Sequence, residues 1–121
     1  MNYSMNCKMV YKIIATYDFE RQLRHLGKKY ASIPSDYAIF LKELSENPEM
    51  GDKLGSNTHK IRMAIASKGK GKRGSARIIT CNVLVSIENT NIYLLTIYDK
   101  GEQDSITEKE IRRLKEHNGL L

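Results

Sequence analysis

The sequence predicts an α+β protein, in which a small, mainly antiparallel sheet carries an N-terminal helical hairpin on one face and is followed by a short C-terminal helix. Over residues 19–44, apolar side chains recur every three or four positions, which is the period of amphipathic helices. Residues 60–98 instead contain stretches rich in β-branched side chains, separated by glycine-rich or polar turns. A helix-capping sequence near residue 107 then begins the last helix.

The length and composition of the chain predict a single domain. It has 121 residues, of which 40% are hydrophobic, and this supports one modest core. We expect a polar N-terminal tail over residues 1–9 and one domain over residues 10–121. No apolar run approaches the ~18 residues of a membrane span, so no membrane partner is expected. Cys7 and Cys81 lie far apart in sequence, which favours the reducing cytoplasm and leaves one bridge between them as the alternative.

The N-terminal part of the chain predicts one strand and two helices. Residues 10–15, Val-Tyr-Lys-Ile-Ile-Ala, have the β-branched and aromatic content of a strand. Asp18 is the expected N-cap of the first helix, whose inward stripe is Phe19, Leu23, Leu26 and Tyr30. Pro34 fits the first turn of the second helix, whose stripe is Tyr37, Phe40, Leu41 and Leu44. That helix ends before Pro48, and the short link between the helices makes them a hairpin.

A meander of three strands is predicted next, after a glycine-containing loop over residues 49–57. The strands span residues 60–66, 77–87 and 92–98, with a hairpin turn at residues 88–91. In the first strand Ile61, Met63 and Ile65 alternate with an exposed, basic side that includes Lys60 and Arg62. Arg77 has the parity of the inward residues of its strand, so either it lies beyond the core or a bulge resets the register. The last strand is apolar on both sides, as expected inside a sheet.

The C-terminal helix has the clearest local signal. Thr107 and Glu110 have the spacing of a capping box, in which the threonine hydroxyl accepts a hydrogen bond from the backbone three residues later. Ile106 and Ile111 have the spacing of the accompanying hydrophobic staple. The helix therefore begins after Thr107, with Ile111 and Leu114 facing inward.

The positive charge of the chain is concentrated in one segment. Lys and Arg number 20 against 14 Asp and Glu, and no acidic residue lies between Asp52 and Glu88. That segment contains Lys53, Lys60, Arg62, Lys68, Lys70, Lys72, Arg73 and Arg77. Within it, residues 67–77 interleave cations with glycines, whose backbone amides can approach phosphate oxygens closely. A local, uncompensated cluster of this kind indicates a polyanionic partner, with nucleic acid first.

Several other interpretations of this segment carry less weight. A Lys/Gly loop is often a solvated hairpin tip, but the number of unopposed charges counts against that interpretation. The loop lacks the G-x-x-x-x-G-K-[ST] pattern, which disfavours nucleotide hydrolysis. The three histidines, His25, His59 and His117, have no metal-ligand spacing, so no metal or other cofactor is expected.

Three stretches of the chain occur together in a characteristic combination. They are Lys60-Ile61-Arg62, the glycine-and-lysine loop that leads from Lys68 into Arg77-Ile-Ile, and Leu94-Leu-Thr-Ile-Tyr-Asp-Lys100. This combination resembles toxins of the RelE/ParE superfamily, on its HigB-like side, over residues 10–115. The resemblance implies a RelE-like fold. Ser75 departs from the pattern, because many of these toxins have glycine at that position.

The resemblance implies a cytoplasmic toxin from a bacterial toxin–antitoxin pair. Toxins of the RelE-like branch cleave messenger RNA in the ribosomal A site and so inhibit translation. The ribose 2′-hydroxyl attacks the adjacent phosphate, and the reaction uses no metal or cofactor. The implied partners are messenger RNA on the ribosome and a cognate antitoxin protein.

The resemblance also implies roles for individual residues. Arg77 matches a phosphate-binding arginine, and Lys100 matches a basic residue that stabilises the leaving group or the transition state. The full catalytic set is Arg77, Lys100, Lys72, Arg73 and Tyr98, and the RNA- and phosphate-binding set is Lys60, Arg62, Lys68 and Lys70. A later tyrosine of some relatives is absent, and Tyr98 is its expected substitute.

Two other functions stay open at the level of sequence. One is a ParE-like, non-enzymatic inhibitor of DNA gyrase, and the other is a plain basic RNA-binding module. The density of Lys and Arg favours the nuclease over the gyrase inhibitor. Few aromatic residues flank the basic run, which disfavours the binding of free single strands by stacking.

Overall fold

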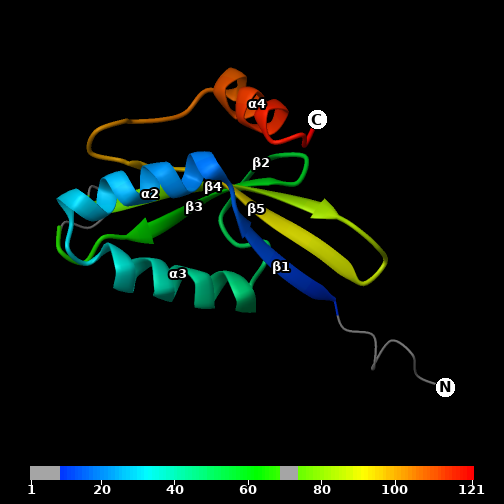
Figure 1. The fold of residues 1–121 in the computed structure, drawn as a ribbon, viewed down its shortest axis with the longest axis horizontal. Coiled ribbons are helices and arrows are strands. Elements are labelled where there is room, and N and C mark those ends of the chain that lie inside the picture. Colours follow the sequence, from blue (N-terminus) through cyan, green and yellow to red (C-terminus); the bar gives the residue numbers. More distant parts are fainter. Residues whose placement is uncertain (1–8, 69–73) are drawn as a thin grey trace.

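The computed structural model describes residues 9–68 and 74–121, which form an α+β fold (Figure 1). Its elements in chain order are β1 (Val10–Ala15), α2 (Tyr17–Lys29), α3 (Ile33–Glu46), β2 (Asp52–Gly55), β3 (Thr58–Ala64), β4 (Ser75–Leu84), β5 (Asn89–Asp99) and α4 (Glu108–His117). Most of the predicted N-terminal tail and the middle of the Lys/Gly loop, residues 69–73, lie outside the described part. None of the described helices is long and apolar enough to cross a membrane.

The five strands form one mixed sheet in the order β1-β5-β4-β3-β2. Strand β1 runs parallel to β5, whereas every other neighbouring pair is antiparallel. The predicted mainly antiparallel sheet is therefore confirmed. The β3-β4-β5 meander forms its centre, and the helical crossover after β1 allows that first strand to join the edge in parallel.

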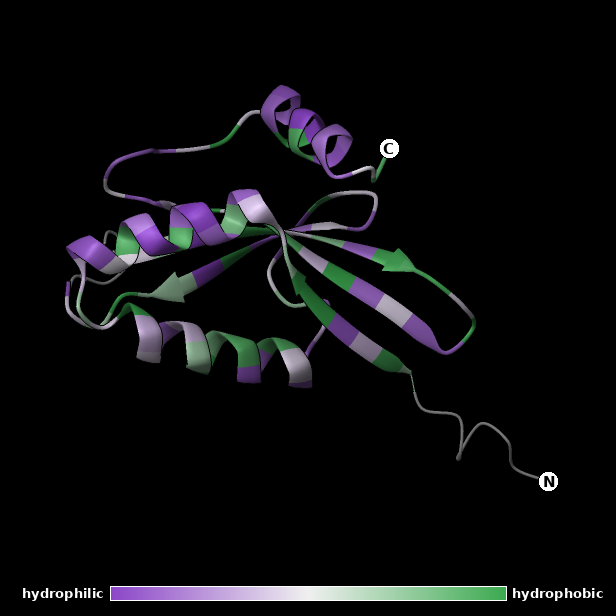
Figure 2. Cartoon of the chain, viewed as in Figure 1, coloured by the Kyte–Doolittle hydropathy of each residue, from purple (hydrophilic) through white to green (hydrophobic). Residues whose placement is uncertain are grey.

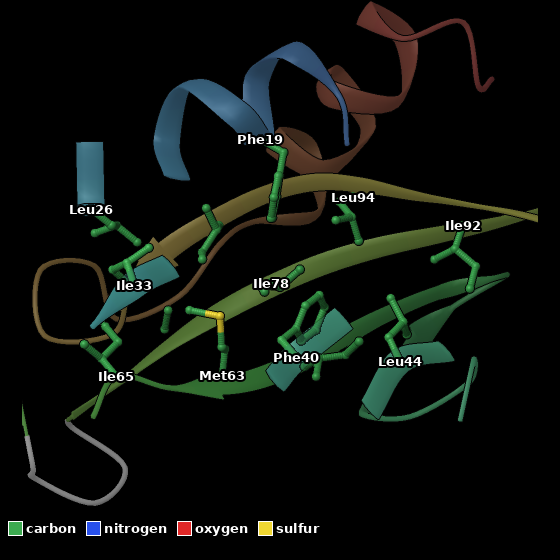
Figure 3. Close-up of a cluster of buried hydrophobic side chains, with 13 residues drawn as sticks. Phe19, Leu26, Ile33, Phe40, Leu44, Met63, Ile65, Ile78, Ile92 and Leu94 are labelled. Atoms are coloured by element: carbon green, nitrogen blue, oxygen red, sulfur yellow. The ribbon is translucent and has the colours of Figure 1, made fainter. Parts of the chain in front are cut away.

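The helical hairpin of α2 and α3 covers one face of the sheet and forms the main core with it. Phe19 and Leu26 from α2 pack with Phe40 and Leu44 from α3 against strand residues such as Ile78 (Figure 3). Figure 2 shows that the rest of α2 is mostly hydrophilic, as expected for a helix with one buried stripe. Leu23, which belongs to the predicted stripe, is only partly buried.

A second, smaller core lies on the opposite face, under α4. Ile111 and Leu114 of this helix pack against Ile79, Cys81 and Leu95 of the sheet. Strands β4 and β5 therefore contribute to a core on each face, and for β5 the apolar sequence of residues 92–98 predicted this. The Thr107 cap is also confirmed, because its hydroxyl accepts a hydrogen bond from the Glu110 amide at 3.1 Å.

The N-cap of α2 is Thr16, so the prediction of Asp18 is wrong. The Thr16 hydroxyl accepts a hydrogen bond from the Phe19 amide and donates one to the Leu94 carbonyl at 2.7 Å. This second hydrogen bond links the start of the helix to β5. Local capping rules consider only neighbouring residues, so they do not predict a cap that is favoured by such a long-range contact. Asp18 lies within the helix and contacts His117 of α4 at 2.9 Å.

Two predicted loop boundaries are also wrong. Residues 49–57 contain the edge strand β2, and Gly51 before it has a φ of +94°, with an added Cβ lying 2.5 Å from the Lys60 carbonyl oxygen. Only glycine allows the backbone to pass so close to Lys60. The glycine that suggested a loop is therefore the residue that allows β2 to pair with β3. At the other end, β4 stops at Leu84 and β5 starts at Asn89, so the hairpin turn spans residues 85–88 and not 88–91 as predicted.

Candidate nucleic-acid interface

Strand register brings four of the predicted site residues onto one face of the sheet. Arg62 of β3 lies opposite Arg77 of β4, and Arg77 lies opposite Tyr98 of β5. Lys60 lies opposite Ile79, which belongs to the core under α4. Residues directly opposite each other project to the same face, so all four side chains lie on the face that carries α4.

Three of these residues line a hollow that we call the basic hollow. It has a volume of about 360 Å³ and is lined by Gly51, Asp52, Lys60, Arg62 and Arg77. Arg62 is exposed, whereas Lys60 and Arg77 are half-buried. The α4 helix covers another part of this face, where the Lys115 ammonium donates to the Thr58 hydroxyl at 2.6 Å. The helix therefore leaves the basic hollow open to a ligand.

Asp52 is the residue of this hollow that sequence reasoning missed. It lies opposite Lys60 in the β2–β3 pair and is the one carboxylate among the described residues that line the hollow. In sequence, Asp52 marks the limit of the acid-free segment and lies within the predicted loop. Only the pairing of β2 with β3 brings its carboxylate beside the cations.

Of the two alternatives for Arg77, the structure shows the first: its side chain is on the α4 face but lies beyond the core under α4. The register between β4 and β5 does shift, but the shift lies between Ile79 and Thr80, where Leu95 has no partner. The bulge therefore belongs to β5 and does not move Arg77 to the other face. Its Nη1 donates to the Ser75 hydroxyl at 2.6 Å, which holds the guanidinium toward the start of β4.

Tyr98 is too buried to stack on a nucleic-acid base, but its hydroxyl carries a proton at neutral pH. Its residue is only 7% exposed, so a nucleic-acid base has no open ring face to stack on. Burial raises the pKa of the Tyr98 hydroxyl, the positive charge of Arg77 opposes this rise, and the negative charge of Asp104 adds to it. With a pKa above the ordinary value of 10.0, the hydroxyl stays protonated at neutral pH.

Lys100 follows β5 and lies close to the start of β4. Its backbone amide donates to the Ser75 carbonyl at 3.2 Å, and the Ser75 hydroxyl in turn accepts the hydrogen bond from Arg77. The Lys100 ammonium donates to Asp104 Oδ1 at 2.7 Å. This hydrogen bond lowers the pKa of Asp104, so the charge of Lys100 is compensated at neutral pH.

Lys68 lies apart from the basic hollow, on the face that carries the helical hairpin. Its ammonium is 2.9 Å from Asp99 Oδ1, and Tyr30 donates to Asp99 Oδ2 at 2.6 Å. Asp99 lies opposite Ala76 of the main core and is itself only 2% exposed. Burial alone raises the pKa of Asp99, but the hydrogen bonds from Tyr30, Lys68 and Gly101 outweigh it and lower the pKa.

The remaining predicted site residues, Lys70, Lys72 and Arg73, lie outside the described residues. Among residues 9–68 and 74–121, no group of three or more His, Cys, Asp or Glu side chains is arranged to hold a metal ion.

No protein-family model matches the sequence. The described part of the site is thus an open hollow with three cations and one carboxylate, next to a buried phenol and a paired lysine. Such an arrangement suits an anionic ligand.

Proposed function

We propose that the protein is a RelE-like toxin of a bacterial toxin–antitoxin pair, which cleaves messenger RNA on the ribosome. The observation that carries the proposal is the convergence of Lys60, Arg62 and Arg77 on one hollow, beside Tyr98 and near Lys100. These five residues come from the three sequence stretches that resemble the RelE/ParE superfamily. The resemblance and the register of the sheet are independent observations, and both support one phosphate-binding surface.

The proposed reaction is attack of a ribose 2′-hydroxyl on the adjacent phosphate. The 2′-oxygen forms a bond to phosphorus, the bond to the 5′-oxygen breaks, and a 2′,3′-cyclic phosphate results. Negative charge accumulates on the phosphate oxygens in the transition state, and the guanidinium groups of Arg62 and Arg77 stabilise it. Arginine suits this role because its planar fork of N–H donors matches phosphate oxygens in pairs.

Two proton transfers complete the proposed reaction. Asp52 is the candidate acceptor of the 2′-hydroxyl proton, because its carboxylate lines the same hollow as the cations. The leaving 5′-oxygen needs a proton donor, and the protonated Tyr98 hydroxyl and the Lys100 ammonium are the candidates. A change from Tyr98 to Phe removes the first donor alone and separates the two roles.

A translation reaction programmed with a defined message tests this function. We expect added protein to produce cuts that primer extension maps to the message, only when ribosomes are translating it. The Arg77→Ala variant should produce few cuts, whereas Arg24→Ala, on the exposed side of α2, should match the wild type. An intact message together with inhibited DNA supercoiling would favour the ParE-like alternative instead.

The proposed toxin also needs a partner that keeps it harmless. The cations that line the open basic hollow, Lys60, Arg62 and Arg77, predict an antitoxin with acidic or apolar segments, encoded beside this chain. Expression of the protein alone should arrest growth, and co-expression of the neighbouring gene product should restore growth and yield a complex on pull-down. Normal growth without any neighbour would count against a toxin.

A further inference from the structure

A second hollow lies on the same face of the sheet as the basic hollow, between α4 and the turn from β2 to β3 (Figure 1). We call it the α4 groove. Its volume is about 450 Å³, within the ~300–1,000 Å³ of pockets that bind small molecules. Its lining combines apolar side chains with two cations and one carboxylate, and it includes Leu54, Ile106, Ile111, Arg112, Lys115 and Glu108. The excess of cations favours an anionic ligand that also has an apolar part.

The α4 groove continues the basic hollow along two strands. Thr58 lines the groove, and Lys60, two residues later on β3, lines the basic hollow. On β2, Leu54 and Asp52 have the same arrangement. A strand rises about 3.3 Å per residue, so Thr58 and Arg62 are separated by about 13 Å along β3. One extended, chain-like ligand can therefore occupy both hollows.

A β-bulge places Leu54 in the groove. The register between β2 and β3 shifts between Lys53 and Gly55, so Leu54 is the extra residue of the edge strand. Bulges at sheet edges commonly re-aim a side chain. Leu54 is 37% exposed, so this apolar part of the lining is open to solvent. An open apolar surface beside cations suits a flat ring that is linked to a phosphate, which is the chemistry of a nucleotide.

The two cations of the groove lie three residues apart on α4 and so share one side of the helix. The Lys115 ammonium donates to the Thr58 hydroxyl at 2.6 Å, which holds it near the sheet and leaves its remaining N–H donors for a ligand. Arg112 is exposed, and no described carboxylate pairs with it. Its neighbour Arg113 instead pairs with Glu110 at 3.5 Å and lines another cavity, on the side of α2. Arg112 is therefore available to an anion.

We propose that the α4 groove binds a nucleotide of the same RNA strand whose cleaved phosphate lies in the basic hollow, an inference that rests on the proposed function. Arg112 and Lys115 bind the phosphate of this flanking nucleotide, and its base packs against Leu54 and Ile106. Apolar contact does not read the hydrogen-bonding edge of a base, so the groove adds affinity and register with little sequence preference. An acidic protein segment would also match the two cations, but the continuity of the groove with the basic hollow favours RNA.

Fluorescence anisotropy with a labelled RNA of nine nucleotides tests the groove. The RNA carries 2′-O-methyl groups, so it lacks the attacking hydroxyl and stays intact. Arg112→Ala should bind it about tenfold more weakly and lower the slope of log affinity against log salt by about 0.7. Leu54→Ala should weaken binding about threefold at an unchanged slope, because it removes an apolar contact. Arg113→Ala is the matched control on the same helix and should bind as the wild type. Equal losses in the two arginine variants, or no loss in Arg112→Ala, would overturn the proposal.

Cleavage on the ribosome separates this inference from the proposed function. Arg112→Ala should raise the KM for programmed ribosomes about tenfold and change kcat by less than about twofold, because Arg112 binds the flanking nucleotide and not the reacting phosphate. A wild-type protein that binds RNA through Arg112 but cuts no message would overturn the nuclease and support the groove. A wild type that cuts, with Arg112→Ala equal to Arg113→Ala in binding and KM, would overturn the groove alone. RNA neither bound nor cut would overturn both. An Arg112→Ala variant that binds RNA normally but loses its antitoxin on pull-down would assign the groove to a protein segment and overturn the proposal.

Discussion

Near the start of β4 and the end of β5, the two faces of the sheet differ in whether their cations are paired with a carboxylate. On the face that carries α4, Arg62 and Arg77 line a hollow that is open to solvent. On the hairpin face, Lys68 is paired with the buried carboxylate of Asp99. The cations of the first face are placed to meet a ligand, whereas the cation of the second face has a partner within the chain.

The difference follows from strand alternation and from burial. Tyr98 and Asp99 are sequence neighbours, but successive strand residues point to opposite faces. The hairpin face is covered by α2 and α3, and a cation there requires a carboxylate because an unpaired buried charge is costly. The hollow is not covered by a helix, so water solvates its cations until an anion displaces it. The basic residues that are close in sequence are therefore divided between the two faces of the sheet: Arg62 and Arg77 lie on one face and Lys68 on the other.

The largest expected effect on the hairpin face is on stability. Asp99→Ala removes the acceptor of Tyr30 and Lys68 together and leaves the half-buried Lys68 ammonium without a carboxylate. We expect the free energy of unfolding to fall by about 3–5 kcal/mol, as measured by urea denaturation. The double variant Asp99→Ala with Lys68→Met should recover part of this loss, since the unpaired cation is then absent. A loss below about 1 kcal/mol in the single variant would mean that the pair behaves as a surface ion pair.

The corresponding change on the α4 face should act on activity rather than on stability. Arg77→Ala removes a half-buried cation whose Nη1 bonds the Ser75 hydroxyl, outside both apolar cores. If Arg77 stabilises the transition state, cleavage should fall by about 10²–10³-fold, which corresponds to about 3–4 kcal/mol. Denaturation midpoints measured in parallel should change little, by about 0.5 kcal/mol in unfolding free energy. Full cleavage by this variant would remove Arg77 from the site, and a large loss of stability would make it a structural residue.

The pH dependence of stability tests the Lys68–Asp99 pair of the hairpin face. The pKa of Asp99 is lowered in the folded protein, so its stabilising effect is present above the ordinary value of 3.8 and is lost as the pH falls through the folded-state pKa. The hydrogen bond to Asp99 raises the pKa of Lys68 above 10.5, so the pair also weakens at strongly basic pH. Unfolding of wild type and Asp99→Asn should be compared from pH 2 to 7. The stability difference between them should shrink below about pH 4, and a constant difference would contradict the assignment.

Much of this fold follows from local patterns in the sequence. The strand over residues 10–15, both amphipathic helices and the Thr107 cap are specified by side-chain period and capping chemistry, which depend on near neighbours. The features that local patterns miss are tertiary. The Thr16 cap depends on the Leu94 carbonyl, and β2 depends on its pairing with β3 and on the close approach at Gly51.

The site follows the same division. The alternation of residues 60–66 correctly places Lys60 and Arg62 on the exposed side of their strand, and register then adds Arg77 and Tyr98. Composition alone could not separate Lys68 from these residues, because its partners Asp99 and Tyr30 are distant in sequence. The one available signal is the alternation of Tyr98 and Asp99 at the end of an apolar strand. A carboxylate in that position requires a partner on the buried face.

The smallest expected effects concern Lys100, whose ion pair is the exposed counterpart of the Lys68–Asp99 pair. Asp104 is 94% exposed at its side chain, so Lys100→Ala should change the unfolding free energy by at most about 1 kcal/mol. Because the carboxylate of Asp104 already offsets the ammonium charge, cleavage should fall only about tenfold, which is about 1.4 kcal/mol in the barrier. Asp104→Asn removes the offsetting charge while keeping the side-chain shape, and it should raise cleavage above the wild-type rate.

Single-turnover cleavage by Lys100→Ala, Asp104→Asn and Arg77→Ala, measured side by side, gives the order of effects. If Lys100→Ala is as severe as Arg77→Ala, Asp104 must release Lys100 when RNA binds. In that case both faces pair a cation with a carboxylate, but only the exposed pair of Lys100 and Asp104 opens to a ligand.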